Sequence, residues 1–134
     1  MPELTGCTPY FEVFDMTQSL GFYRDGLGFE VLFASPEVQT REGRFSHFVH
    51  LACGGVRLML NTAHDSNERP PERPAPRDGV HLYIDCDDVD AVHAEVVARG
   101  VKAEAPRVTG YGWRAFSVQD PDGYRVIFQQ PISK

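Results

Sequence analysis

The chain carries the stretch TPYFEVFD at residues 8–15, and the same pattern returns as HLYIDCDD at residues 81–88. Both stretches are rich in aromatic and β-branched residues, which is typical of β-strands. Each one ends on an aspartate, Asp15 or Asp88, where a helix N-cap is expected. Apolar residues then recur at three- and four-residue spacing until a glycine ends the predicted helix. The sequence therefore encodes a strand followed by a helix twice.

Three further strands are predicted after each helix. The Gly54-Gly55 pair in the first half and DPDG at residues 120–123 in the second provide tight turns between strands. Alignment of the two halves matches Gly28 with Gly100 and leaves one extra residue inside the first helix. The predicted strands are residues 29–33, 45–52 and 56–61 after the first helix, and residues 101–105, 115–119 and 124–130 after the second.

This repeat predicts an α+β fold of two tandem βαβββ modules, residues 5–61 and residues 79–130, within one domain. We expect their curved mixed sheets to enclose a concave cavity that holds a ligand. Residues 62–78 contain four prolines among charged and small side chains, so they are predicted to form a linker or surface loop.

Composition excludes several classes of protein. With a hydrophobic fraction of 42% over 134 residues, the chain can form a proper core. The net charge of −6 argues against binding to nucleic acid, which requires a basic face. The sequence has neither a long apolar run nor a secretory signal, so we expect no membrane partner and a cytoplasmic location. Three cysteines without metal-ligand spacing indicate reduced, buried thiols.

Strand alternation predicts which side chains lie under the helices and which face the cavity. At equivalent cavity-facing positions of the two modules, Glu12 matches Asp85 and Arg57 matches Arg125. We predict that these four residues form ion pairs near the cavity wall. The helix-facing set is Phe11, Val13, Leu58, Leu60, Leu82, Ile84, Val126 and Phe128. The cavity-facing set is Thr8, Tyr10, Glu12, Arg57, Met59, Asn61, His81, Tyr83, Asp85, Arg125, Ile127 and Gln129.

Three segments carry a family resemblance. They are the Asp15-capped helix with its Phe22-Tyr23 pair, its second copy DDVDA at residues 87–91, and the turn DPDGY at residues 120–124. Together they resemble the vicinal oxygen chelate superfamily, which includes glyoxalase I, extradiol dioxygenases, fosfomycin resistance enzymes and bleomycin resistance proteins. The resemblance covers essentially the whole chain and implies the fold, whereas one scaffold of this kind hosts several chemistries.

The resemblance also implies where a metal would bind. Enzymes of the superfamily carry His, Glu or Gln ligands at equivalent positions on the first and fourth strands of each module. Only one of the four corresponding residues here, a histidine, is a suitable ligand for a divalent cation. We therefore expect no metal and no other cofactor. The four positions fall on Thr8, Met59, His81 and Ile127.

Without metal ligands, the pattern is closest to the bleomycin resistance branch, whose aromatic segment is similar to YGWRAFSV at residues 111–118. Proteins of this type sequester a planar, often cationic compound and catalyse nothing. The resemblance thus implies metal-free binding of a small aromatic ligand, such as an antibiotic, by a homodimer. Aromatic rings would supply stacking area, and Trp113 is the strongest candidate. The candidate ligand contacts are His81, Trp113, Tyr10, Tyr83, Phe33, Phe45, Met59 and Phe116.

Two enzymatic alternatives stay open. The first is a metal-dependent lyase, isomerase or dioxygenase with an atypical ligand set, for which Glu12, Asp85 and His50 are the nearest displaced candidates. The second is a metal-free enzyme in which His81 acts as general acid or base beside Tyr83 or Asp85, since a histidine in a cavity can titrate near neutral pH.

Overall fold

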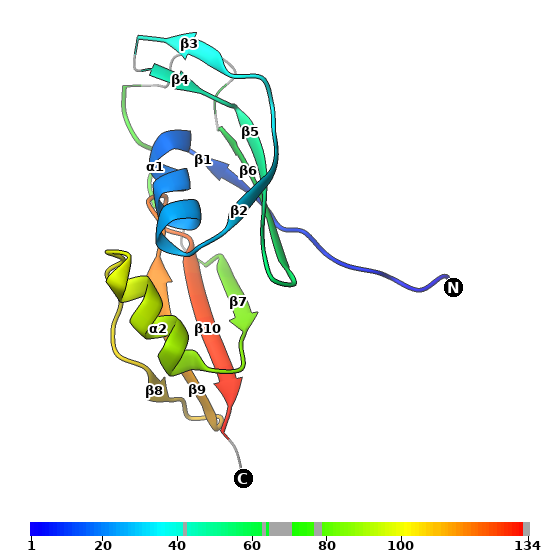
Figure 1. The fold of residues 1–134 in the computed structure, drawn as a ribbon, viewed down its shortest axis with the longest axis vertical. Helices are drawn as coiled ribbons and strands as arrows, with labels where there is room; N and C mark the ends of the chain where they lie inside the picture. The colour runs from blue at the N-terminus through cyan, green and yellow to red at the C-terminus, as the bar shows by residue number, and fades with distance from the viewer. Residues whose placement is uncertain (42, 63, 65–70, 77–78, 133–134) are drawn as a thin grey trace.

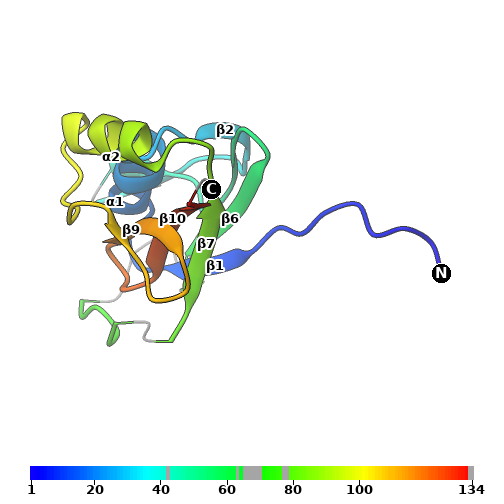
Figure 2. The ribbon, with the colours of Figure 1, turned by 90° about the horizontal axis from the view of Figure 1, so that it is seen from below.

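The computed structural model describes all residues except 42, 63, 65–70, 77–78 and 133–134. Two four-stranded sheets lie one above the other in Figure 1, and the helices lie on the same side of both (Figures 1 and 2). Residues 1–9 extend away from this body (Figure 1). Within the described residues, no helix is long and apolar enough to cross a membrane.

The first sheet has the strand order β1-β6-β5-β2, and a short hairpin of β3 and β4 accompanies it. Strand β1 is parallel to β6, whereas the other neighbours are antiparallel. Its elements are β1 (Tyr10–Val13), α1 (Met16–Leu20), η1 (Gly21–Gly26), β2 (Glu30–Ala34), β3 (Val38–Thr40), β4 (Gly43–Phe45), β5 (Phe48–Cys53) and β6 (Val56–Thr62).

The second sheet has the strand order β7-β10-β9-β8. As in the first sheet, the strand that comes first in the chain, β7, is parallel to the strand that comes last, β10. Tyr10 lies beside Met59 in the β1-β6 pair, and Tyr83 lies beside Ile127 in the β7-β10 pair. This common register is the one that the repeat requires. The elements are β7 (His81–Asp85), α2 (Val89–Ala98), β8 (Arg107–Val108), β9 (Trp113–Gln119) and β10 (Arg125–Pro131).

The predicted helix caps are confirmed. The Asp15 carboxylate accepts a hydrogen bond from the backbone N–H of Gln18, and the Asp88 carboxylate accepts one from the backbone N–H of Ala91. Each aspartate thus satisfies a backbone donor that the first helical turn leaves without a partner.

The extra residue of the first helix is accommodated as a π-helical turn. Helix α1 continues directly into η1, where the backbone N–H of Leu27 donates to the carbonyl of Phe22, five residues earlier, at 2.9 Å. Such turns commonly occur as single wide turns within α-helices. Because the inserted residue is absorbed there, Tyr23 and Leu27 still reach the core.

Two predicted strand boundaries were wrong. Residues 101–105 form no strand, because Val101 packs against Gly26 and the edge strand forms later, as β8. Residues 45–52 do not form one strand either, since Phe45 ends β4 and β5 begins at Phe48. In both places the pairing partner, rather than local propensity, sets the boundary.

The predicted alternation along the strands is confirmed. The helix-facing set is buried apart from Leu82, which is partly buried. The opposite set is exposed or half-buried apart from Ile127, which is buried. The cysteine prediction was wrong in part: all three thiols are free, but Cys7 and Cys53 are exposed.

Candidate ligand-binding site

The sheet surfaces turned away from the helices, called the open face below, carry most of the predicted contacts. In the first sheet, Tyr10 of β1 lies beside Met59 of β6. His50 of β5 lies on the other side of Met59, and Phe33 of β2 lies beyond it. One row across four strands thus combines two aromatic rings, a thioether and an imidazole. Such side chains pack well against planar aromatic molecules.

The second sheet repeats part of this row. Tyr83 of β7 lies beside Ile127 of β10, and Ser117 of β9 lies beyond it. His81 lies two residues earlier on β7, beside Arg125, with its ring 6.4 Å from that of Tyr83. The equivalent position to His50 is therefore a small hydroxyl residue in the second sheet, so the two halves of the open face differ in polarity.

The open face is exposed to solvent in a single chain. Tyr10, Phe33 and Tyr83 are 50%, 58% and 53% exposed. His81 is exposed as well. About half of each ring therefore faces water, so one chain alone leaves these predicted contacts uncovered.

The remaining predicted contacts lie apart from these rows. Trp113 has the open-face parity of Ser117 but begins β9 at the far end of the sheet, beside Pro131. Phe45 lines a hollow of about 230 Å³ between the β3-β4 hairpin and the start of α1. Phe116 is buried on the helix side of β9, stacked 5.1 Å from Phe128. Phe116 therefore belongs to the hydrophobic core and does not lie on the open face.

His50 is an open-face residue that the predicted contacts did not include. Its Nε2 atom is buried and has no hydrogen-bond partner among the described residues. A buried polar atom of this kind is costly unless a partner satisfies it, and a polar group on a ligand could do so. The sequence did hold a signal: pairing outward from the two-residue Gly54-Gly55 turn places His50 opposite Met59.

The predicted ion pairing between acids and bases of the open face is wrong in the second sheet. Asp85 accepts a hydrogen bond from Nε2 of Gln129 at 3.0 Å. Arg125 donates to the hydroxyl of Ser117 at 3.4 Å. Same-sheet neighbours therefore satisfy both charged groups.

Residues 11–128 match the model of the family described as the Glyoxalase/Bleomycin resistance protein/Dioxygenase superfamily. The chain belongs to this superfamily. Among its relatives is YaeR, an uncharacterised protein of Escherichia coli strain K12, which is 36% identical over 113 residues that cover 81% of this chain and 82% of YaeR.

Two solved structures show how similar the fold is to that of known proteins. TnmS3, an antibiotic binding protein from Streptomyces sp. CB03234, is 27% identical with a TM-score of 0.69, covering 98% of this chain and 99% of TnmS3. The bleomycin-binding protein in complex with bleomycin also has a TM-score of 0.69, covering 96% of this chain and 100% of that protein. At 18% identity, the second likeness concerns the fold alone.

The metal site that the superfamily implies does not fit the residues present. The implied positions hold a threonine, a methionine and an isoleucine beside His81, and these offer no set of hard or borderline donors for a divalent ion. Across the described part of the chain, no three His, Cys, Asp or Glu side chains gather closely enough to hold a metal ion.

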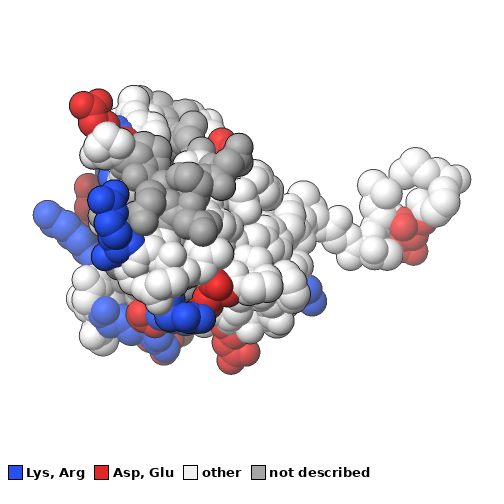
Figure 3. All heavy atoms as spheres, turned by 90° about the horizontal axis from the view of Figure 1, so that it is seen from above, with Lys and Arg blue, Asp and Glu red and all other residues white. Residues whose placement is uncertain are grey.

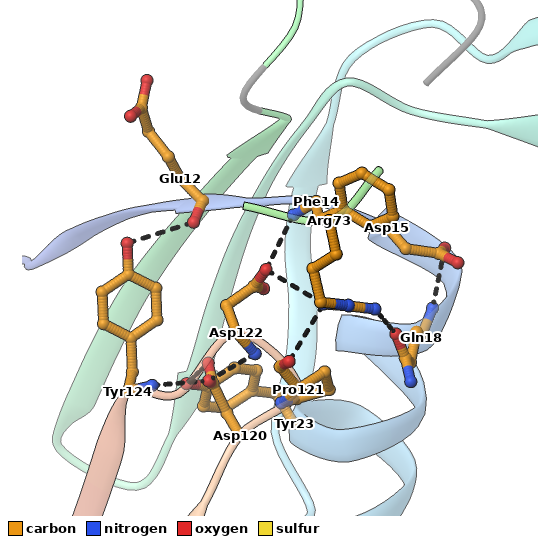
Figure 4. Close-up of polar contacts among 10 residues, drawn as sticks. All are labelled: Glu12, Phe14, Asp15, Gln18, Tyr23, Arg73, Asp120, Pro121, Asp122 and Tyr124. Carbon is orange, nitrogen blue, oxygen red and sulfur yellow. Dashed lines mark hydrogen bonds and ion pairs between the residues drawn. The ribbon is translucent and has the colours of Figure 1, made fainter. Parts of the chain in front are cut away.

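The DPDGY turn at residues 120–124 joins the two halves of the molecule instead of contacting the open face (Figure 4). The buried Asp120 carboxylate accepts hydrogen bonds from the Tyr23 hydroxyl at 2.7 Å and from the backbone N–H of Tyr124 at 2.8 Å. Burial raises the pKa of Asp120, although these hydrogen bonds oppose the shift. Burial and the neighbouring Asp120 also raise the pKa of Tyr23. This turn is therefore structural.

Charge is distributed without a strong bias on the face seen in Figure 3. Basic and acidic side chains are interspersed along its edges, and neither sign forms a continuous patch among the described residues there (Figure 3). Together with the net charge of −6, this distribution does not resemble a nucleic-acid interface.

Proposed function

We propose that the chain binds a small aromatic organic molecule on its open face, without a metal, and that it sequesters the molecule, such as an antibiotic, instead of transforming it. The observation that carries this proposal is the row from Tyr10 through Met59 and His50 to Phe33. Its rings supply stacking area, and the buried Nε2 of His50 supplies a polar contact that would orient the ligand. The description of TnmS3 as an antibiotic binding protein supports the same class of ligand.

A second copy of the chain is part of the proposal. Ligand pockets bury most of the surface of a small molecule, and a half-exposed row of side chains on one sheet does not. Exposed apolar residues at Tyr10, Phe33 and Tyr83 are the kind of surface that a partner covers. We propose a cytoplasmic homodimer in which the second chain closes the open face. A particle of 15.0 kDa in light scattering at micromolar concentration would contradict the dimer.

Ligand binding is tested by thermal shift against a panel of planar aromatic antibiotics that begins with bleomycin. A compound at about 100 times its dissociation constant adds roughly 2.7 kcal/mol of stability. We expect Tyr10→Ala and Tyr83→Ala to lose this gain. Tyr111→Ala is the matched control, because Tyr111 is an exposed tyrosine in the loop before β9. Equal stabilisation of all three variants would place the ligand elsewhere.

Metal analysis tests the other half of the proposal. Protein purified without chelators is measured by inductively coupled plasma mass spectrometry, and we expect far less than one equivalent of nickel, zinc, iron or manganese. One equivalent that disappears in His81→Ala would refute metal-free binding and favour a metal-dependent lyase, isomerase or oxygenase.

A further inference from the structure

A second cavity, of about 270 Å³, lies where the two halves of the molecule meet. It is formed by the turn between β5 and β6, the chain after η1, the end of β7 and one side of α2. Ile84 lines it, whereas its neighbour Tyr83 belongs to the open face. Successive strand residues point to opposite faces, so Ile84 reaches the cavity from the helix side of β7, and Asp85 borders it only where β7 ends.

The walls of this junction cavity are mostly apolar and come from the hydrophobic core. Phe29 comes from the first half, whereas Ile84, Val96 and Phe128 come from the second, and all four are buried. Core residues of this kind are held in fixed positions by their packing, so the apolar wall of the cavity is rigid. Its volume is near the lower end of the range for small-molecule sites.

Two glycines leave the cavity unfilled. Gly54 and Gly55 form the β5-β6 turn at its edge and contribute no side chains. A Cβ atom added to either would meet nothing within 4 Å. The cavity is open to solvent on this side, because Cys53, Gly54 and Gly55 at its edge are exposed, so a small molecule can enter it.

The electrostatic surroundings disfavour an anionic occupant. Asp85 and Glu95 line the cavity, and Arg99 pairs with Glu95 at 3.4 Å. Cys86 also lines it, and burial raises the pKa of its thiol. A backbone hydrogen bond at Asp88 opposes this shift, whereas the charges of Asp87 and Asp85 add to it. An anion would therefore enter a region that already carries negative charge.

We propose that the junction cavity is a second ligand site, separate from the open face, that takes a small uncharged aromatic molecule. Apolar walls supply the free energy of burial, and the surrounding carboxylates reject an anionic analogue. The proposal stands independently of the function proposed for the open face.

Two fluorescent probes that differ by one sulfonate test this selectivity. N-phenyl-1-naphthylamine is uncharged, and 8-anilino-1-naphthalenesulfonate is its sulfonated counterpart. We expect saturable binding of one uncharged probe per chain and at least tenfold weaker binding of the sulfonate. Tighter binding of the sulfonate would overturn the proposed selectivity.

The cysteines report where the uncharged probe binds in the wild-type protein. Cys53 lines the junction cavity and is exposed, whereas Cys7 is exposed but lies outside it. At about ten times its dissociation constant, a bound probe should slow alkylation of Cys53 by iodoacetamide about tenfold, because only the free protein reacts. Alkylation of Cys7, followed by peptide mass spectrometry, should not change. If the probe leaves the alkylation rate of Cys53 unchanged, the site is refuted.

A filled variant gives an independent test. Cys53→Phe places a ring at the edge of the cavity and should weaken binding of the uncharged probe at least tenfold. Tyr111→Ala, which alters an exposed tyrosine outside both proposed sites, should leave binding within twofold. Binding that is lost in Tyr83→Ala and kept in Cys53→Phe would assign the probe to the open face and overturn the proposal. Since Cys53 is exposed, the filled variant should fold, and its circular dichroism checks this.

Discussion

The substitution Arg73→Ala should destabilise the protein, although Arg73 lies in the proline-rich segment predicted to be a linker. Its guanidinium donates to the backbone carbonyl of Pro121 at 2.9 Å and to the carboxylate of Asp122 at 3.3 Å (Figure 4). It also donates to the side-chain carbonyl of Gln18 and lies 4.7 Å from the centre of the Phe14 ring. One linker side chain thus holds the start of α1 and the 120–124 turn together.

The size of the effect follows from the burial of the partner. The side chain of Asp122 is 7% exposed, whereas that of Arg73 is 36% exposed. Hydrogen bonds to charged groups contribute about 1.5–3 kcal/mol, and partial exposure reduces this figure. The contact with the Phe14 ring adds about 0.5–1 kcal/mol. We expect Arg73→Ala to lower the free energy of unfolding by about 2 kcal/mol, or Tm by roughly 6–8 °C for a chain of this size.

Urea unfolding followed by tryptophan fluorescence and circular dichroism measures this change. Arg73→Lys keeps the charge but loses the planar fork that reaches several acceptors, so it should recover less than half of the loss. The matched control is Arg114→Ala. Arg114 is also 36% exposed and donates to Asp90 at 2.8 Å, but Asp90 is 59% exposed.

Because water solvates Asp90 once its partner is removed, Arg114→Ala should have the smaller effect. The reasoning from burial is refuted if Arg114→Ala destabilises as much as Arg73→Ala, or if Arg73→Ala leaves the urea midpoint unchanged.

Three further predictions concern the turn at residues 120–124 and the β5-β6 turn. Tyr23→Phe removes the hydroxyl that donates to Asp120 at 2.7 Å and should destabilise by about 1.5–3 kcal/mol in urea, since the carboxyl group stays buried without that donor. Burial raises the pKa of Asp120 above its ordinary value of 3.8, so its contribution to stability is present below that pH and is lost as pH rises through the folded-state pKa. The unfolding free energy of the wild type minus that of Asp120→Asn should therefore fall as pH rises from about 3 to about 7. A rise in this difference would contradict the raised pKa. Gly54 has a φ of +56°, so Gly54→Ala should lose about 1 kcal/mol, whereas Gly55→Ala, where φ is not positive and space is open, should change urea stability by less than about 0.5 kcal/mol.

Most of the fold could be predicted from short-range features of the sequence. The N-caps at Asp15 and Asp88 are satisfied within three residues, and the two-residue turn at Gly54-Gly55 sets its own hairpin register. Alternation along a strand decides which side chains share a face, whatever lies across from it. The extra residue of the first helix was visible as well, but its accommodation as a π-helical turn was not, because that depends on keeping Tyr23 and Leu27 in the core.

The site depended on contacts between distant residues. Phe116 appears as suitable for stacking as Trp113 in the sequence, and only its pairing with Phe128 across β9 and β10 places it in the core. His50 lies beside Phe33 because β2 aligns with β5, whereas its place opposite Met59 follows from the tight turn. A residue type carries no information on its lateral neighbours beyond a tight turn, since the register of non-adjacent strands is set by packing of the whole sheet.

The sequence by itself determined that the chain has two copies of one module. It also determined that three of the four ligands of the implied superfamily metal site are missing. Those properties are local, because caps, turns and donor atoms act within a few residues. Only the tertiary structure decided that the open face is half exposed in one chain, that Arg73 ties the linker to the module junction, and that a cavity remains beside Cys53. Each of these depends on how two folded halves pack together, which is set by the shape of their surfaces and not by any one segment.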